Sequence, residues 1–321
     1  MDINILLALQ EFRNSVGEFL AEFLSKMTFL GEKSTVLVII AIIYWCISKE
    51  YGGYFLLGMC GNRILNGFLK VTACAYRPWI RDARIIPHGN SMETATGYSF
   101  PSGHSTNAAT LYGGGAIRKE LPRILRIFIA VILVLIAFSR IYLGVHTPQD
   151  ILVGSLLGLL VMWLTLKLVQ WVEVHPDKDI MVMLIGIGIA VAVAIYASVK
   201  PYPEHYDAAG ELLVDGAKMA KDTYKSVGMS IGFLSGWVLE RRCIGFSTDA
   251  PMLTRITRLV TGLFGYYVVD LILAFFLKEW IPGTGGIIAS NFMQMFYVSF
   301  IFPWCIKHTE KQRDASRIGR I

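Results

Sequence analysis

Charged residues are scarce in this sequence. Asp, Glu, Lys and Arg make up 17% of the 321 residues, whereas soluble domains carry about a quarter. Hydrophobic residues reach 54%, and the mean hydropathy is +0.52. Some apolar runs are long enough to cross a bilayer, as in residues 180–198. The composition therefore argues against a water-soluble enzyme and indicates an integral membrane protein.

Several motifs that would carry other chemistry are also missing. No G-x-x-x-x-G-K-[ST] string occurs, which argues against a nucleotide-driven motor. No H-E-x-x-H or C-x-x-C string occurs either, so we expect neither a metal nor another cofactor. The net charge of +6 is spread over the ends of apolar segments and forms no single patch. We therefore expect membrane lipids as partners and no nucleic acid.

The apolar segments predict an all-α fold, a polytopic transmembrane helix bundle with about nine spans. Residues 3–28 have helical apolar spacing but are too polar for a span, and they predict an interfacial helix. Gly228, Gly232 and Gly236 recur every four residues and predict close helix packing. The expected spans lie near 33–48, 52–70, 102–117, 124–140, 148–171, 180–198, 226–239, 258–277 and 287–306.

This pattern predicts four parts of the chain. They are an interfacial amphipathic helix over 1–30, a core bundle over 31–172, further transmembrane helices over 173–306 with an extracytoplasmic loop at 199–225, and a cytoplasmic basic tail over 307–321.

Basic residues predict which ends of the helices face the cytoplasm. They gather after the third span, after the seventh span and in the C-terminal tail, and a count of nine places all three groups on one side. The positive-inside rule makes that side cytoplasmic. The loops that follow Lys70, Arg140 and Ser198 are then extracytoplasmic, in the cell membrane if the source is a bacterium.

Three polar strings lie at span ends on this outer face and supply residues suited to phosphate. Lys70, Arg77 and Arg140 favour a phosphate, because guanidinium groups match its oxygens in pairs and the ammonium group adds a point charge. Ser102 and Gly103 follow a proline at a helix start, where backbone N–H groups and the helix dipole favour an anion. Together these residues predict a phosphate-binding site.

Two histidines indicate chemistry beyond binding. His146 lies just before the expected helix start at Thr147-Pro148, and Asp150, four residues on, can accept from one imidazole nitrogen. The other nitrogen is then free to attack phosphorus, while His104 protonates the leaving oxygen and later activates water. A plain helix cap by Thr147 and Asp150 also fits this pattern taken alone.

The strings 70-KVTACAYRP-78, 101-PSGH-104 and 139-SRIYLGVHTPQD-150 resemble the three signatures of the type 2 phosphatidic acid phosphatase superfamily. The resemblance implies that His146, His104 and Asp150 are catalytic and that Lys70, Arg77, Ser102, Gly103 and Arg140 bind phosphate. It also implies an enzyme that needs no metal, with a core of about six helices.

We therefore expect a metal-independent phosphoric monoester hydrolase in the membrane. Its substrate would be a phosphate or pyrophosphate of a lipid, such as phosphatidate, an isoprenoid pyrophosphate or a sphingoid phosphate, cleaved through a phosphohistidine. One alternative is a phosphatase or phosphotransferase for a polar phosphoester such as a sugar phosphate. Another, from a different class, is a phospholipid-binding or transport protein without catalysis.

Overall fold

The computed structural model describes residues 2–207 and 209–309. Within these residues the fold is all-α, as expected, with short 3₁₀ and π turns and a single antiparallel bridge between Tyr206 and Leu212. The chain divides into two compact units, and each is assembled from separate stretches. The first unit takes Met1–Leu37, Gly61–Lys167 and Ile195–Thr223, and the second takes Val38–Cys60, Leu168–Ala194 and Tyr224–Ile321. The expected basic tail lies almost entirely outside the described residues.

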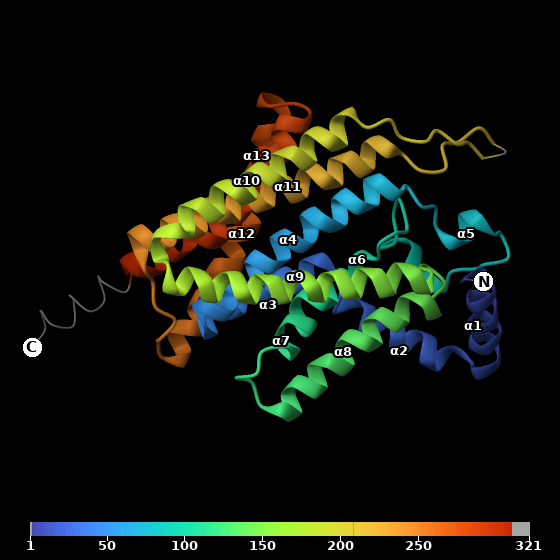
Figure 1. Ribbon diagram of the computed structural model, residues 1–321, viewed down its shortest axis with the longest axis horizontal. Helices are drawn as coiled ribbons and strands as arrows, with labels where there is room; N and C mark the ends of the chain where they lie inside the picture. The colour runs from blue at the N-terminus through green and yellow to red at the C-terminus, as the bar shows by residue number, and fades with distance from the viewer. Residues whose placement is uncertain (1, 208, 310–321) are drawn as a thin grey trace, which may run out of the picture. The chain divides into compact units, whose positions relative to one another are not determined.

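The helices have the following bounds (Figure 1): α1 Asp2–Val16, α2 Glu18–Phe29, α3 Lys33–Ile42, α4 Lys49–Ala73, α5 Pro78–Arg81, α6 Gly103–Ala108, α7 Gly114–Ala116, α8 Arg123–Tyr142, α9 Pro148–Val174, α10 Asp179–Val199, α11 Gly216–Leu239, α12 Met252–Trp280 and α13 Thr284–Phe296. The π turns are Ile43–Ile47, Ala109–Gly113, Glu240–Ile244 and Tyr297–Ile301, and the 3₁₀ turns are Gly89–Met92 and Pro176–Lys178.

The expected count of nine spans is not confirmed. By length and apolarity, five of the described helices can cross a membrane, or six if α2 and the helix after it form one bent span. The remaining expected spans coincide with α4, α6 to α7, and α11, which are helical but do not meet the criterion. In α4 the reason is polar side chains, among them Asn62, Arg63, Asn66 and Lys70, which are tolerated only inside a bundle.

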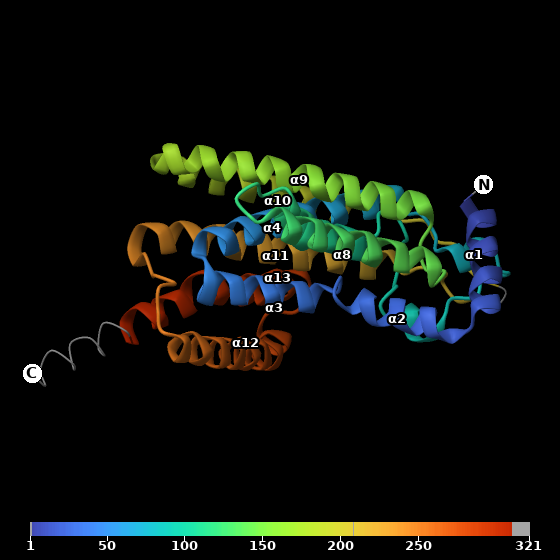
Figure 2. The ribbon, with the colours of Figure 1, turned by 90° about the horizontal axis from the view of Figure 1, so that it is seen from below.

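The N-terminal stretch differs from the single helix expected over residues 3–28. Gly17 has a φ of 83°, a left-handed value that interrupts the helix, so two helices form. Both views show α1 and α2 as neighbours that meet at this bend (Figures 1 and 2). In the first unit α2 packs along α8, and the Arg13 side chain donates to Tyr142 O at the end of α8.

Small residues allow the first unit to bring backbones close together. A Cβ atom added at Gly154 of α9 would lie 2.9 Å from Ser102 O, and one at Gly158 would lie 2.6 Å from the Ala109 Cβ. Helix α9 therefore packs directly against the start of α6. This contact fixes the position of the PSGH string relative to the turn that precedes α9.

The second unit confirms the packing predicted from the glycine repeat. A Cβ at Gly228 would lie 2.3 Å from Ile288 O, one at Gly232 would lie 2.1 Å from Phe292 O, and one at Gly236 would lie 2.1 Å from Ser299 Oγ. Helix α11 therefore meets α13 and the turn after it at van der Waals distance. In the same unit α12 packs beside α13 (Figure 2).

Candidate active site

The three polar strings meet at one end of the first unit. Lys70 lies in the last turn of α4, and Arg77 precedes α5. Arg140 lies in the last turn of α8, and a tight turn through Gly144, whose φ is 76°, leads to His146. The backbone N–H of His146 donates to Arg140 O at 3.2 Å, so this turn ties the two side chains to one place.

His146 is buried and has a defined tautomer. Its Nε2 lies 2.8 Å from Arg77 Nη1, and its Nδ1 lies 3.1 Å from Asp150 Oδ2. A guanidinium group can only donate, so Nε2 must be the acceptor. The ring proton is then on Nδ1, directed at the carboxylate. The imidazole therefore presents an unprotonated Nε2 to the group of cations.

Asp150 is both a helix cap and the partner of His146. Its Oδ2 accepts from the backbone N–H of Thr147 at 2.8 Å, and its own N–H donates to Thr147 Oγ1 at 3.3 Å. This reciprocal pair starts α9, with Pro148 in the first helical position. The cap and the histidine partner, which are alternative interpretations of the sequence, are therefore both present, and the cap holds the carboxylate in place for the imidazole.

Ser99 is a member of the site that the sequence reasoning missed. Its Oγ donates to Asp150 Oδ2 at 2.5 Å and lies 3.3 Å from His146 Nδ1. The side chain is 1% exposed. Ser99 lies outside the three polar strings, so the sequence gave no sign of its role. Its contact with Asp150 depends on the path of the loop, which comes back to the chain just after α4, where the Ser99 N–H donates to Ala75 O.

Backbone carbonyls of this loop and of the turn before α9 orient Arg77 and Lys70. Arg77 donates from Nε to Gly97 O at 3.0 Å, from Nη2 to Thr96 O at 3.1 Å and from Nη1 to Val145 O at 3.0 Å. Lys70 Nζ donates to Tyr98 O at 2.9 Å and to Pro101 O at 3.2 Å. Carbonyl oxygens are neutral, so these contacts position both cations without cancelling their charge.

Arg140 and His104 are buried with donor capacity left over. Arg140 is 0% exposed and donates from Nη1 to Thr28 Oγ1 at 2.9 Å, but its Nε and Nη2 have no partner in the described chain. Nor does His104 Nε2 have a partner among those residues. Unpaired buried polar atoms are costly and call for a ligand or water. Both side chains interact electrostatically with Arg77.

The start of α6 differs in part from the expectation. The Ser102 backbone N–H donates to Asp150 O at 3.0 Å, so it is already used within the chain. The Ser102 side chain caps the helix by accepting from Ser105 N–H. Gly103 and His104 occupy the first two helical positions, whose N–H groups have no acceptor within the helix. A Cβ at Gly103 would meet no atom within 4 Å, so open space lies beside this residue.

Burial and positive charge set the protonation of His146. Burial first, and then Arg77, Arg140 and Lys70, lower its pKa well below the usual value of 6.5. Burial also lowers the pKa of Arg77, to about 10, which leaves it charged at neutral pH. The site therefore combines a neutral imidazole with cations, which suits nucleophilic attack on a bound phosphate.

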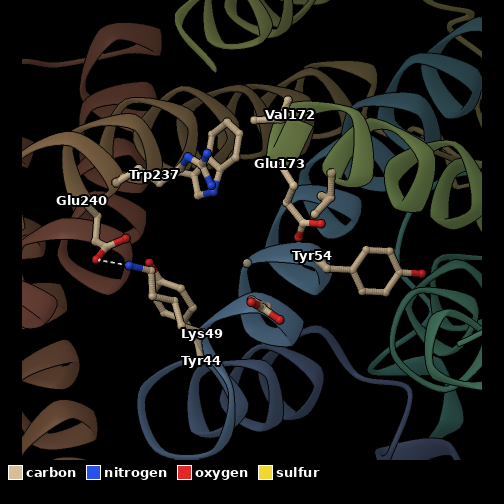
Figure 3. Close-up of a pocket in the computed structure, with 11 residues that line it drawn as sticks. Tyr44, Lys49, Tyr54, Val172, Glu173, Trp237 and Glu240 are labelled. Atoms are coloured by element: carbon tan, nitrogen blue, oxygen red, sulfur yellow. Dashed lines mark hydrogen bonds and ion pairs between the residues drawn. The ribbon is translucent and has the colours of Figure 1, made fainter. Parts of the chain in front are cut away.

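A cavity of about 60 Å³ in the second unit has a different character (Figure 3). Lys49 Nζ and Glu240 Oε1 form an ion pair of 2.7 Å at its edge, and Glu173 also lines it. With Glu50 and Arg241, its lining holds three carboxylates and two cations, which disfavours a phosphate. Within residues 2–207 and 209–309 no group of three or more His, Cys, Asp or Glu side chains is arranged to hold a metal ion.

Two family models match the sequence. One, described as the PAP2 superfamily, matches residues 51–173, and the other, described as PAP2 superfamily phosphatase, transmembrane extension, matches residues 224–313. Phosphatidylglycerophosphatase B of Bacillus subtilis (strain 168) is 37% identical over 158 residues, which cover 46% of this chain and 73% of that protein.

Other relatives match over shorter stretches. Undecaprenyl-diphosphatase of Sulfolobus acidocaldarius is 37% identical over 26% of this chain and 39% of its own length. Decaprenylphosphoryl-5-phosphoribose phosphatase of Mycobacterium tuberculosis is 43% identical over 21% of this chain and 36% of its own length. A crystal structure titled as a transmembrane PAP2 type phosphatidylglycerolphosphate phosphatase from Bacillus subtilis is 33% identical, with a TM-score of 0.45, over 53% of this chain and 85% of that chain.

Proposed function

The chain belongs to the PAP2 superfamily and is a membrane phosphatase of lipid phosphates; from this premise we propose that it works through a phosphohistidine formed at His146. The observation that carries the proposal is the pair of contacts on that imidazole. Nδ1 faces Asp150, and the unprotonated Nε2 faces the cations. A nucleophile needs this arrangement, since Asp150 stabilises the positive charge that the ring acquires on attack.

The first half-reaction transfers the phosphoryl group to the protein. The bond from His146 Nε2 to phosphorus forms, and the bond from phosphorus to the ester oxygen breaks. His104 gives a proton to the departing oxygen, so the product leaves as an alcohol. In the structure Arg77 donates to the Nε2 lone pair of His146 that has to attack phosphorus. The incoming phosphate must therefore draw the guanidinium onto its own oxygens before attack.

The second half-reaction restores the enzyme. Water gives a proton to His104 and attacks phosphorus, the bond from phosphorus to Nε2 breaks, and inorganic phosphate leaves. Lys70, Arg77, Arg140 and the N–H groups at the start of α6 stabilise the charge on the equatorial oxygens in both steps. Arg140 supports this role directly, because two of its nitrogens have no partner in the described chain.

A lipid phosphate or pyrophosphate is the substrate class we propose. The relatives carry names for lipid phosphates of several kinds, a phosphatidylglycerol phosphate among them. A membrane location favours an amphiphile, and Lys70, Arg77 and Arg140 bind the phosphate that all of these lipids share. We also propose that the site opens on the extracytoplasmic side, on the strength of the positive-inside count, with the C-terminus cytoplasmic.

The test is phosphate release by purified protein in detergent, with phosphatidylglycerol phosphate, undecaprenyl pyrophosphate, phosphatidate and a sugar phosphate. We expect one of the lipids to be preferred and EDTA to leave the rate unchanged. The His146→Ala variant should lose turnover by about a thousandfold or more while it still binds the lipid. Acid-labile, base-stable ³²P on the wild-type protein, absent from His146→Ala, is the expected intermediate. Full turnover by His146→Ala would refute the phosphohistidine.

A further inference from the structure

The segment between α10 and α11 falls between the two matched regions. The first family model ends at residue 173 and the second begins at residue 224. Nevertheless, Ile195–Thr223 belongs to the same compact unit as the active site. Figure 1 shows this segment beyond the end of α4, the helix that carries Lys70.

The end of α10 is attached to the last turns of α4. The Tyr196 ring lies 5.1 Å from the Phe68 ring, and its hydroxyl lies 3.1 Å from Thr72 Oγ1. Lys200 Nζ donates to Val71 O and lies 3.0 Å from Cys74 Sγ. The contacts at Val71, Thr72 and Cys74 fall between Lys70 and Arg77 in the sequence, so the segment packs against the stretch that connects the two phosphate-binding cations.

His205 extends this contact to the neighbour of Arg77. Its Nδ1 lies 2.7 Å from the Tyr76 hydroxyl, and the two rings are 5.7 Å apart. The Tyr76 ring also lies 6.1 Å from the ring of Tyr98, whose carbonyl accepts from Lys70. His205 itself is exposed, whereas Tyr98 is buried. One exposed histidine thus touches the loop beside both cations.

The first turn of α11 meets Gly97, whose carbonyl accepts from Arg77. Met219 is 3% exposed and lies against Gly97 so closely that a Cβ there would be 2.2 Å from its Sδ. Gly97 has a φ of 68°, and its carbonyl accepts from Arg77 Nε. The segment therefore contacts two groups next to Arg77: His205 contacts Tyr76, and Met219 contacts Gly97.

We propose that residues 196–207 and 209–219 form a wall of the substrate site and that His205 is a positioning residue, which fixes Arg77 through the Tyr76 hydroxyl. The proposal rests on the proposed function, because it assigns the segment to the phosphate-binding step. Arg77 has to move from His146 onto the substrate, so the precision of its loop sets how tightly phosphate and transition state are held. Neither matched region contains this element.

Substitutions at the pair test the proposal. His205→Leu removes the hydrogen bond, and Tyr76→Phe removes it from the other side. His205→Asn keeps an amide atom close to the position of Nδ1. His175→Leu is the matched control, since His175 is also exposed and its Nδ1 contacts the Trp171 carbonyl in the last turn of α9. Each protein is assayed for kcat, for KM and for inhibition by vanadate, which mimics five-coordinate phosphorus, and its melting temperature is recorded.

We expect His205→Leu and Tyr76→Phe each to raise KM and the vanadate inhibition constant by roughly three- to tenfold, the range of one neutral hydrogen bond, with kcat within about twofold. His205→Asn should recover most of the loss. The double variant should be no worse than either single one, because both remove the same bond. Unchanged melting temperatures would show that the effect is local.

The outcomes separate this inference from the proposed function. If wild type turns over lipid phosphate and His205→Leu matches His175→Leu in KM and vanadate inhibition, the positioning role is wrong and the proposed function stands. Additive losses in the double variant would also overturn it, since the two groups would then act separately. Wild-type protein that releases no phosphate from any lipid of the panel would overturn both.

Discussion

The buried charges of the two units are balanced in opposite ways. In the second unit each buried carboxylate faces a cation, as with Glu240 and Lys49 at 2.7 Å or Asp179 and Arg242 at 2.6 Å. At the candidate active site of the first unit, Lys70, Arg77 and Arg140 converge, and Asp150 contacts the group through His146. The paired charges hold helices together, whereas the excess positive charge is satisfied only when an anion arrives.

This difference distinguishes structural from functional charged residues in a membrane bundle, where every buried charge is costly. A charge that the chain itself neutralises contributes to folding. A cation held by carbonyl oxygens, or left with unpaired donors, is a cost of folding that ligand binding offsets. The two kinds of residue should therefore respond in opposite ways to substitution by an apolar side chain.

Arg140→Met should give the largest effect. Arg140 is a buried cation with two nitrogens that have no hydrogen-bond partner in the described chain. Its removal takes away one clamp on the transition state, and we expect kcat/KM to fall by about 10²- to 10³-fold. The melting temperature should stay constant or rise, because no buried charge is left unpaired. Turnover and thermal unfolding of the same preparation measure both. A large loss of stability would show that Arg140 is structural and would remove the contrast between the units.

Lys49→Met should do the reverse in the second unit. It leaves the fully buried Glu240 without its cation, and breaking such a pair costs about 3 kcal/mol or more. We expect a clear fall in the melting temperature and, per folded molecule, unchanged turnover. The double variant Lys49→Met with Glu240→Gln is the control, since it removes both charges and should recover part of the stability. Loss of activity without loss of stability would contradict this account.

The sequence predicted which side chains meet at the active site better than it predicted what holds them. Arg77, His146 and Asp150 were found by type and spacing, because the chemistry limits the choice of residue. Their roles stay predictions. Ser99 and the carbonyl of Gly97 were not found, since their contacts depend on the path of a loop. Every residue has a backbone carbonyl, so the sequence does not show which of them accepts a hydrogen bond.

The span count was not confirmed for a related reason. Hydropathy separates lipid-facing helices from soluble ones, but α4 is helical over Lys49–Ala73 and too polar to be counted. Such a helix is identified by the hydrogen bonds that its polar side chains make inside the bundle. Asn62 Nδ2, for example, donates to Thr110 Oγ1 at 2.8 Å. The close packing of α11 was predicted correctly because a glycine repeat records a close approach directly.

Ser99→Ala should have a moderate effect confined to the first unit. Its hydroxyl donates to Asp150, and a hydrogen bond to a charged group contributes about 1.5–3 kcal/mol. We expect kcat to fall by about tenfold with KM nearly constant, because Asp150 stabilises the imidazolium that forms during attack. Ser99→Thr keeps the hydroxyl and should recover activity. Equal losses in both variants would point to packing and away from the hydrogen bond.

The smallest effect should be the response to mild acid. The pKa of His146 is lowered by burial and by neighbouring cations, so its imidazole stays neutral as the pH falls through 6.5. We expect kcat/KM to change by less than about twofold between pH 8 and 6.5, once the ionisation of the substrate, followed by ³¹P NMR, is divided out. The folding stability should also depend on pH in this range. A histidine whose pKa is lower in the folded than in the unfolded protein contributes to the free energy of unfolding above the unfolded pKa near 6.5, and this contribution is lost as the pH falls further. Arg140→Met removes one cation that repels a proton on His146, so the pKa of His146 should rise. The loss of kcat/KM on the acid side of the pH profile, the acid limb, should therefore move to higher pH. An acid limb at 6.5 in wild type that does not move in the variant would mean that the cations do not control His146.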